Sequence, residues 1–213
     1  MKSPSRSLLA ELRDAAQRNI LYANPVLTTA LGICTIVAAA TTLENGWILS
    51  QLLALVLIPE CLLSSACFSR LPRYLSTPAV AVSAAGFYTL GMLLLQWRYG
   101  SMTLLFRYYL PLIALNSMML SRAVRYAPRQ SLRTALIDSA TCAAGFAVAA
   151  CLVGGVRELF QSGTLGGVTL IHTSPALHMA QVPFFGFIVL GFVCALWRAI
   201  RLRHIQKEGR KPR

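Results

Sequence analysis

The chain has 213 residues, of which 56% are hydrophobic and only 13% are charged, and its mean hydropathy is +0.60. That composition excludes a free soluble domain, because a chain this short cannot bury so much apolar surface away from water. Lys and Arg exceed Asp and Glu by 20 to 7, but the excess lies in short segments beside apolar runs, which favours contact with anionic lipid headgroups over nucleic-acid binding.

Residues 1–23 predict an amphipathic helix at the cytoplasmic membrane surface. Between residues 5 and 22, leucine, isoleucine and alanine recur at helical spacing, and Arg6, Arg13 and Arg18 occupy the rest of the circumference. A helix with one apolar face and basic residues on the other lies in the plane of the headgroups. We therefore expect an interfacial segment that precedes the membrane domain.

Six apolar runs follow, and together they predict an all-α membrane protein. At a rise of 1.5 Å per residue each run is long enough, or nearly so, to cross a hydrocarbon layer of ~30 Å, and the first and fourth are among the shortest. A single six-helix domain is expected over residues 24–200, with a basic cytoplasmic tail at 201–213. The runs lie at residues 26–42, 48–66, 78–96, 104–120, 134–154 and 183–199.

The basic residues determine the predicted orientation. If residue 1 lies in the cytoplasm, 17 of the 20 Lys and Arg residues fall in the inner segments, and only Arg98, Arg107 and Arg157 fall outside. Because short loops rich in Lys and Arg stay on the cytoplasmic side, both termini are predicted to be cytoplasmic.

The order of the runs also predicts two inverted three-helix repeats, at about residues 24–97 and 104–200. Three crossings per unit make the second unit an upside-down copy of the first. Each unit begins with an early proline and a later small or polar pair, which aligns Cys34 with Ser117. Short helices of this kind stop near the membrane midplane, where their ends can form a buried site. The aligned segments are NPVLTTALGIC (24–34) and YYLPLIALNS (108–117).

Two acidic residues in the apolar runs are candidates for an ion path. Glu60 follows Pro59 in the inner half of the second span, where a carboxyl group is costly unless it is paired, protonated or hydrated. It belongs either to an ion or proton path or to the class of protonated or helix-capping carboxyls near the interface. Asp138, near the cytoplasmic end of the fifth span, is either a salt-bridged or snorkelling residue or an ion ligand.

Residues 156–183 are too polar and too rich in glycine to cross the membrane. We expect them to form an outer loop before Pro183 opens the sixth helix. Arg157 and Glu158, at the start of this segment, are expected to pair with neighbouring groups or with a partner subunit.

Four segments, in this order, resemble one family of membrane proteins over residues 20–200. They are similar to the paired six-helix subunits of the Rnf and Na+-translocating NADH:quinone oxidoreductase complexes. The similarity is greatest to the E subunit of Rnf, followed by the D subunit of the quinone reductase. The segments are NPVLTTALGIC (24–34), LPLIALNSMMLSRAVRYA (110–127), VRELFQSGTLGG (156–167) and HTSPALHMAQVPFFGFIVLGF (172–192).

The resemblance implies a [2Fe-2S] cluster shared with a homologous partner of opposite orientation, the A subunit of Rnf or the E subunit of the quinone reductase. In that family each short helix contributes one cysteine, and such clusters take four soft thiolate ligands. Cys34 matches the first position, whereas Ser117 stands where the family has a cysteine after asparagine. Three outcomes follow: a cluster with three thiolates and one other ligand, loss of the cluster, or replacement by another cysteine. Without a cluster, Cys34 is a small residue that allows close helix contact beside Gly32.

The function that the resemblance implies is that of an integral subunit of an Rnf-type ion-translocating complex in the bacterial cytoplasmic membrane. Such complexes pass electrons between ferredoxin or NADH and NAD or a quinone. The chain contains no Gly-rich dinucleotide loop, so it is not expected to bind the nicotinamide or to act as an enzyme alone. The alternative is a cluster-less scaffold or small transporter subunit with the same fold, which the serine at position 117 favours.

Overall fold

The computed structural model describes residues 15, 19, 24, 26–68, 72–100, 110–114, 116–169 and 182–209. Most of the predicted N-terminal amphipathic helix therefore lies outside the described residues. Within the described part, four helices are long and apolar enough to cross a membrane. They are α3 (Leu43–Ala66), α4 (Arg73–Tyr99), α7 (Leu132–Ser162) and α8 (Pro183–Gly209).

Polar residues and glycine set the ends of these helices. α3 begins after Thr42, whose hydroxyl accepts a hydrogen bond from the Asn45 amide at 3.1 Å, and α7 begins after Ser131 in the same way. α7 ends at Gly163, whose φ of 68° lets the chain leave the helix.

The predicted start of the outer loop at residue 156 is wrong, because α7 continues to Ser162. Arg157 and Glu158 are buried and hydrogen-bonded, so these polar residues are compatible with a helix that continues. A two-stranded hairpin follows, formed by β1 (Thr164–Leu165) and β2 (Val168–Thr169). The rest of the predicted loop, residues 170–181, lies outside the described part.

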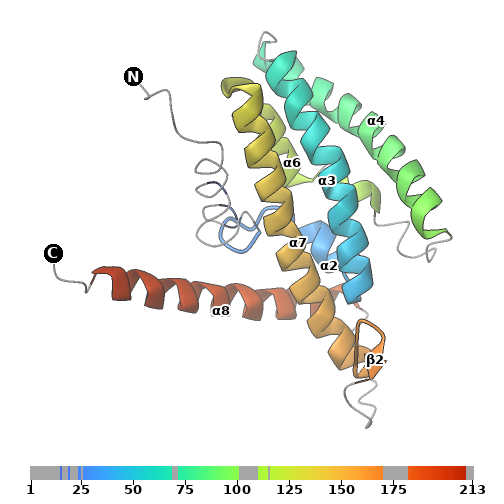
Figure 1. Ribbon diagram of the computed structural model, residues 1–213, viewed down its shortest axis with the longest axis vertical. Coiled ribbons are helices and arrows are strands. Elements are labelled where there is room, and N and C mark those ends of the chain that lie inside the picture. Colours follow the sequence, from blue (N-terminus) through green and yellow to red (C-terminus); the bar gives the residue numbers. More distant parts are fainter. Residues whose placement is uncertain are drawn as a thin grey trace.

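The core is the antiparallel pair α3 and α7, which lie side by side along the long axis (Figure 1). Gly46 lies against the backbone of Ala150, and Gly154 lies against the backbone of Thr42, so small residues bring the two helices into close contact. Leucine, valine, alanine and phenylalanine side chains fill the space between them. Those that are fully buried include Leu49, Leu52, Leu53, Val56, Phe146, Ala149, Ala150 and Val153.

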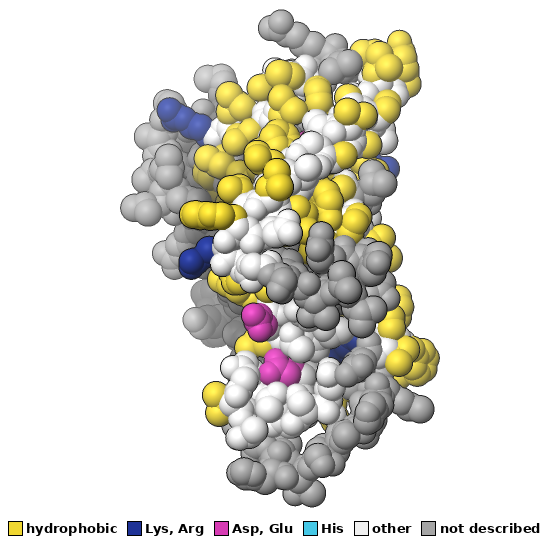
Figure 2. All heavy atoms as spheres, turned by 90° about the vertical axis from the view of Figure 1, so that its right-hand side faces the viewer, with side chains coloured by type: hydrophobic (Ala, Val, Ile, Leu, Met, Phe, Trp, Pro, Cys, Tyr) yellow, Lys and Arg dark blue, Asp and Glu magenta, His cyan; other side chains and the backbone are white. Residues whose placement is uncertain are grey.

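α4 and α8 are far less covered than the core pair. Only 22% and 17% of their most apolar windows are buried, against 56% for α3 and α7, so most of the apolar surface of α4 and α8 is exposed in the isolated chain. α4 packs along α3, where Gly91 lies against Leu52 and the Tyr99 hydroxyl donates to Gln51. α8 contacts α2 and α7 and runs across the long axis (Figure 1). Figure 2 shows hydrophobic side chains gathered over the upper part of the face that includes α4.

The first apolar run does not form one continuous helix. Asn24 accepts hydrogen bonds from the amides of Val26 and Leu27 and makes a turn, and the φ angles of Ala30 (58°) and Gly32 (80°) interrupt the helical path. Only α2 (Ile33–Ala39) is helical in this run. The run predicted to span residues 26–42 is therefore a short helix preceded by irregular chain.

The fourth apolar run is interrupted as well. After a 3-10 turn, η3 (Leu110–Ile113), Asn116 adopts an extended conformation, and α6 (Ser117–Leu120) starts a new helical segment. This segment continues through the π-helix η4 (Ser121–Tyr126) and the 3-10 turn η5 (Ala127–Arg129), beyond the predicted end at residue 120. Residues 101–109 lie outside the described part, so six continuous transmembrane helices are not confirmed.

Candidate functional site

The two short helices begin at the same place, which we call the helix junction: Gly32, Cys34, Thr35, Asn116 and Ser117. The Gly32 amide donates a hydrogen bond of 3.0 Å to the Ser117 hydroxyl, and the Asn116 side-chain amide donates one of 3.2 Å to the Thr35 hydroxyl. These bonds join residues more than 80 positions apart in the sequence. Figure 1 shows α2 and α6 near the middle of the long axis, next to the core pair.

Local sequence explains why both helices start here. The Asn116 carboxamide oxygen accepts the Met118 amide at 3.0 Å and so caps α6, and the Thr35 hydroxyl donates to the Gly32 carbonyl at 2.8 Å. Two features of the backbone at position 32 require glycine. Its φ is positive, and a Cβ atom would lie only 3.1 Å from the Asn116 oxygen and 3.2 Å from the Phe146 ring.

Cys34 and Ser117 both lie in the first turns of these helices, and both are exposed in the isolated chain. The Cys34 thiol is therefore accessible from outside the chain. Among the described residues no group of three or more His, Cys, Asp or Glu side chains is close enough to hold a metal ion. The described part of this chain therefore does not form a complete metal site by itself.

Glu60 belongs to α3, and its side chain lies between α3 and α4, away from solvent. One carboxylate oxygen accepts a hydrogen bond of 2.8 Å from the Ser83 hydroxyl, whereas the other, Oε2, is buried and has no hydrogen-bond partner. An unpartnered oxygen of this kind is uncommon in a folded protein, because a buried polar atom without a partner is costly. Glu60 therefore keeps one carboxylate oxygen that can still accept a hydrogen bond or bind a cation.

Asp138 has a different environment, because its carboxylate is already paired. It forms a salt bridge of 2.8 Å with Arg122 and accepts a hydrogen bond of 3.1 Å from Asn19. Asp138 is therefore salt-bridged in this structure, and its partner lies on η4. Glu60 and Asp138 do not share a hydrogen-bond partner among the described contacts.

Arg157 and Glu158 hold the turn between α2 and α3. The fully buried Arg157 guanidinium donates to the carbonyls of Val37 at 2.7 Å and Ala40 at 3.2 Å, at the carboxyl end of α2. The Glu158 carboxylate accepts the Leu43 amide at 2.9 Å, at the amino end of α3. The helix dipole leaves partial negative charge at a helix C-terminus and partial positive charge at an N-terminus. A cation at the first and an anion at the second are therefore both stabilising.

Sequence reasoning did not find four of the residues that organise these sites: Asn19, Thr35, Asn116 and Arg122. Thr35 and Asn116 lie in apolar segments, and Arg122 lies next to one. Polar residues at such positions usually have a buried partner. That signal identifies the residue but not the partner, because the long-range contacts join residues that are 16 to 122 positions apart in the chain.

Comparison with known proteins assigns the family. The family described as Rnf-Nqr subunit, membrane protein, matches residues 12–194, which include the helix junction, Glu60 and Asp138. The chain belongs to the Rnf-Nqr family. The resemblance noted in the sequence is thereby confirmed, and this Rnf-Nqr chain is a membrane protein.

Relatives in the Rnf-Nqr family align over most of their length. The E subunit of an ion-translocating oxidoreductase complex from Shewanella loihica is 30% identical, over 96% of this chain and 93% of that protein. The E subunit of the Na(+)-translocating ferredoxin:NAD(+) oxidoreductase complex from Acetobacterium woodii is 28% identical, over 84% and 92%. An E subunit from Methanosarcina acetivorans is also 28% identical, over 78% of this chain and 81% of that protein.

Proposed function

We propose that this chain is a membrane subunit of an Rnf-type ion-translocating electron-transfer complex. Its relatives are named as the E subunits of such complexes and align over nearly their whole length. The single observation in this chain that supports the role is the helix junction, where two interrupted helices begin side by side and expose Cys34. Interrupted helices in a membrane are tolerated where they line a protein-covered site.

The helix junction is the surface at which we place a homologous subunit of opposite orientation. Cys34 and Ser117 are exposed in this chain, although they lie at helix ends that in a membrane need protein cover. A second junction facing this one would enclose both. The proposal includes the other subunits of the complex as further partners.

The donor set fits one part of a [2Fe-2S] site. Such a cluster takes four ligands and supplies one-electron transfer when bound. Cys34 would hold it from this chain, and the partner would contribute the other thiolates. Ser117 is the weaker candidate, because its hydroxyl already accepts the Gly32 amide and is a harder donor than a thiolate. Gly32, Thr35 and Asn116 would keep Cys34 in position.

The proposed topology has six helices in two inverted repeats, with both termini in the cytoplasm. α2 and α6 would be the interrupted first helices of the two repeats. Support comes from the basic residues, 17 of which fall in the inner segments under this orientation.

For the ion path, Glu60 is the acid with capacity to bind. Its Oε2 atom has no partner, whereas the Asp138 carboxylate is neutralised by Arg122. We therefore assign ion or proton binding to Glu60 first. Asp138 contributes to the path only if its salt bridge opens.

Iron analysis of the intact complex tests the cluster. The complex is purified without oxygen from cells that carry the original chain, Cys34→Ala, or Cys67→Ala, which removes another exposed cysteine and serves as the matched control. Cys34→Ala is expected to lose about two iron atoms per complex, and Cys67→Ala none. Full iron content in an assembled Cys34→Ala complex would overturn the cluster assignment and leave the subunit assignment intact.

A cluster-less scaffold is the second candidate function, and one observation favours it. Ser117 works as a structural hydrogen-bond acceptor that joins α6 to α2, a role that needs no metal. Under this alternative, Cys34→Ala and the original chain contain the same iron, and the complex assembles equally well with either.

A further inference from the structure

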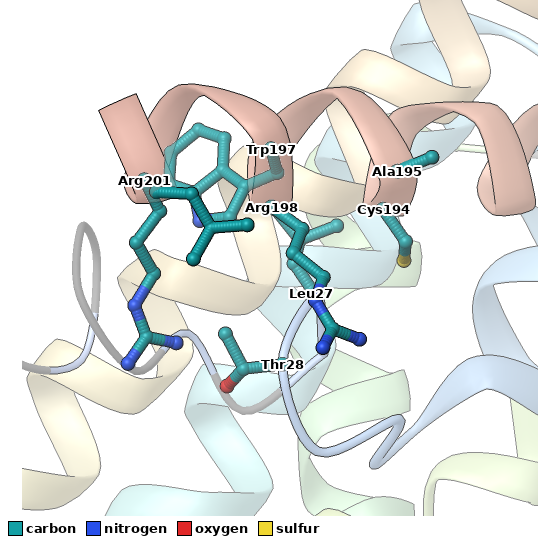
Figure 3. Close-up of a pocket in the computed structure, with 8 residues that line it drawn as sticks. Leu27, Thr28, Cys194, Ala195, Trp197, Arg198 and Arg201 are labelled. Carbon is teal, nitrogen blue, oxygen red and sulfur yellow. The ribbon is translucent and has the colours of Figure 1, made fainter. Parts of the chain in front are cut away.

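A basic pocket lies between the C-terminal half of α8 and the chain around Leu27. Its volume is about 660 Å³, within the range of ~300–1,000 Å³ typical of small-molecule sites. Figure 3 shows Arg198 and Arg201 reaching from α8 toward the segment that carries Leu27 and Thr28, with the Trp197 ring beside Arg201. The pocket is lined by Leu27, Thr28, Cys194, Ala195, Trp197, Arg198, Arg201 and Leu202.

The pocket contains donors that lack acceptors. The indole Nε1 of Trp197 and the Nε atom of Arg201 are buried and have no hydrogen-bond partner. Among the described residues, no acidic side chain forms an ion pair with Arg198 or Arg201. The Thr28 hydroxyl donates to the Asn24 carbonyl, so it offers the pocket only acceptor capacity. An anion with several acceptor oxygens would satisfy these donors, and a phosphate group has that chemistry.

We propose that this pocket binds the phosphate group of an anionic phospholipid. A lipid is favoured over free phosphate because apolar side chains share the lining, and because α8 exposes a row of large apolar residues along which acyl chains can lie. The exposed residues on α8 are Phe184, Phe187, Ile188, Phe192, Leu196, Ile200 and Leu202.

Lipid retention tests the proposal in the full-length chain, purified with its partner subunits in detergent. The double variant Arg198→Gln, Arg201→Gln is compared with Arg203→Gln, which removes an exposed arginine of the same helix that does not line the pocket. After washing, bound phospholipid is identified by mass spectrometry and its phosphorus is measured. The double variant is expected to lose about one anionic lipid per chain, and Arg203→Gln to keep it. Equal retention in all three proteins would overturn the proposal.

Fluorescence of Trp197 distinguishes the source of the phosphate. Replacing Trp47 and Trp97 by Phe leaves Trp197 as the single tryptophan. In vesicles, brominated phosphatidylglycerol is expected to quench it several-fold more than brominated phosphatidylcholine. Millimolar inorganic phosphate is expected not to relieve this quenching. Equal quenching by the two lipids, or relief by inorganic phosphate, would overturn the assignment to an anionic phospholipid.

Discussion

Asp138 and Arg122 form an ion pair that is largely withdrawn from solvent, with 3% and 18% of the two side chains exposed. Removing one member of a buried pair leaves the other charge uncompensated, at a cost of ~3–5 kcal/mol. We predict that Arg122→Met lowers the free energy of unfolding by about 3 kcal/mol, at the lower end of that range because Arg122 is partly exposed. Unfolding in mixed detergent measures the loss.

Arg125→Met is the matched control for this ion pair, because Arg125 lies on the same π-helix but its side chain is exposed. We expect its effect to stay within ~0.5 kcal/mol, as for most surface substitutions. Similar losses for the two variants would show that the pair with Asp138 does not stabilise the fold.

Glu60 offers a test of ion movement that is separate from stability. Glu60→Gln keeps the size of the side chain and an oxygen that can accept from Ser83, but it cannot ionise. If Glu60 carries the ion, the complex with Glu60→Gln should transport ions at least tenfold more slowly, while its unfolding changes by less than ~1 kcal/mol. Ion uptake by proteoliposomes measures the first quantity. Normal uptake would exclude Glu60 from the path.

The sequence was enough to identify important individual residues, but not the residues that they contact. Glu60 and Asp138 were identified because carboxyl groups are rare in apolar spans. Asn19 and Arg122 were missed as partners of Asp138 because their contacts depend on how distant segments pack, which the order of residues does not state. The hydrogen bond between Gly32 and Ser117 was not predicted, because the similarity of the two segments aligned Cys34, rather than Gly32, with Ser117.

Among the elements, the core pair α3 and α7 depends on glycine. A Cβ atom on Gly46 would lie 2.7 Å from the Ala150 carbonyl oxygen, which is backbone and cannot move aside easily. We predict that Gly46→Ala destabilises the protein by ~1–3 kcal/mol despite the higher helix propensity of alanine. Gly86→Ala on α4 is the control, since a Cβ there meets nothing within 4 Å. Thermal unfolding compares the two, and a neutral Gly46→Ala would contradict the close approach.

The short helix α2 depends on Arg157. Arg157→Met leaves the carbonyls of Val37 and Ala40 without their charged donor, and each unsatisfied group costs ~1–3 kcal/mol. We predict a loss of about 3 kcal/mol, and a smaller loss for Arg157→Lys, which keeps the charge but not the forked geometry. Unfolding in detergent measures both, with Arg98→Met, an exposed arginine on α4, as the control. Equal effects of Met and Lys would contradict this role.

Hydropathy alone was enough to predict the long helices. The long helices α3, α4, α7 and α8 match four of the six apolar runs, although each extends beyond the predicted limits. The start of α2 was not predictable from hydropathy. It depends on the positive φ angle of Gly32 and on contacts from Asn116, which belong to tertiary structure. The continuation of α7 through residues 156–162 was missed because Arg157 and Glu158 look like surface residues in the sequence.

For the whole molecule, exposure separates a core from two outer helices. α3 and α7 bury each other, whereas α4 and α8 present large apolar side chains outward, as Figure 2 shows for the face that includes α4. In water such a surface would cause aggregation, but in a bilayer it is the natural surface toward lipid or neighbouring helices. The exposed helix junction adds a polar region to be covered. Both features are those of a subunit rather than of a free-standing transporter.

The proposed orientation gives a prediction for the whole molecule. Because 17 of 20 basic residues fall in the inner segments, a fluorescent-protein fusion after Arg213 should fold in the cytoplasm and fluoresce, and alkaline phosphatase fused there should be inactive. Phosphatase fused after Gly100, at the end of α4, should be active, because that position follows an odd number of crossings. An inactive fusion at Gly100 together with an active one at Arg213 would invert the topology. It would also place Glu60 nearer the outer surface and reverse the side from which it loads its ion.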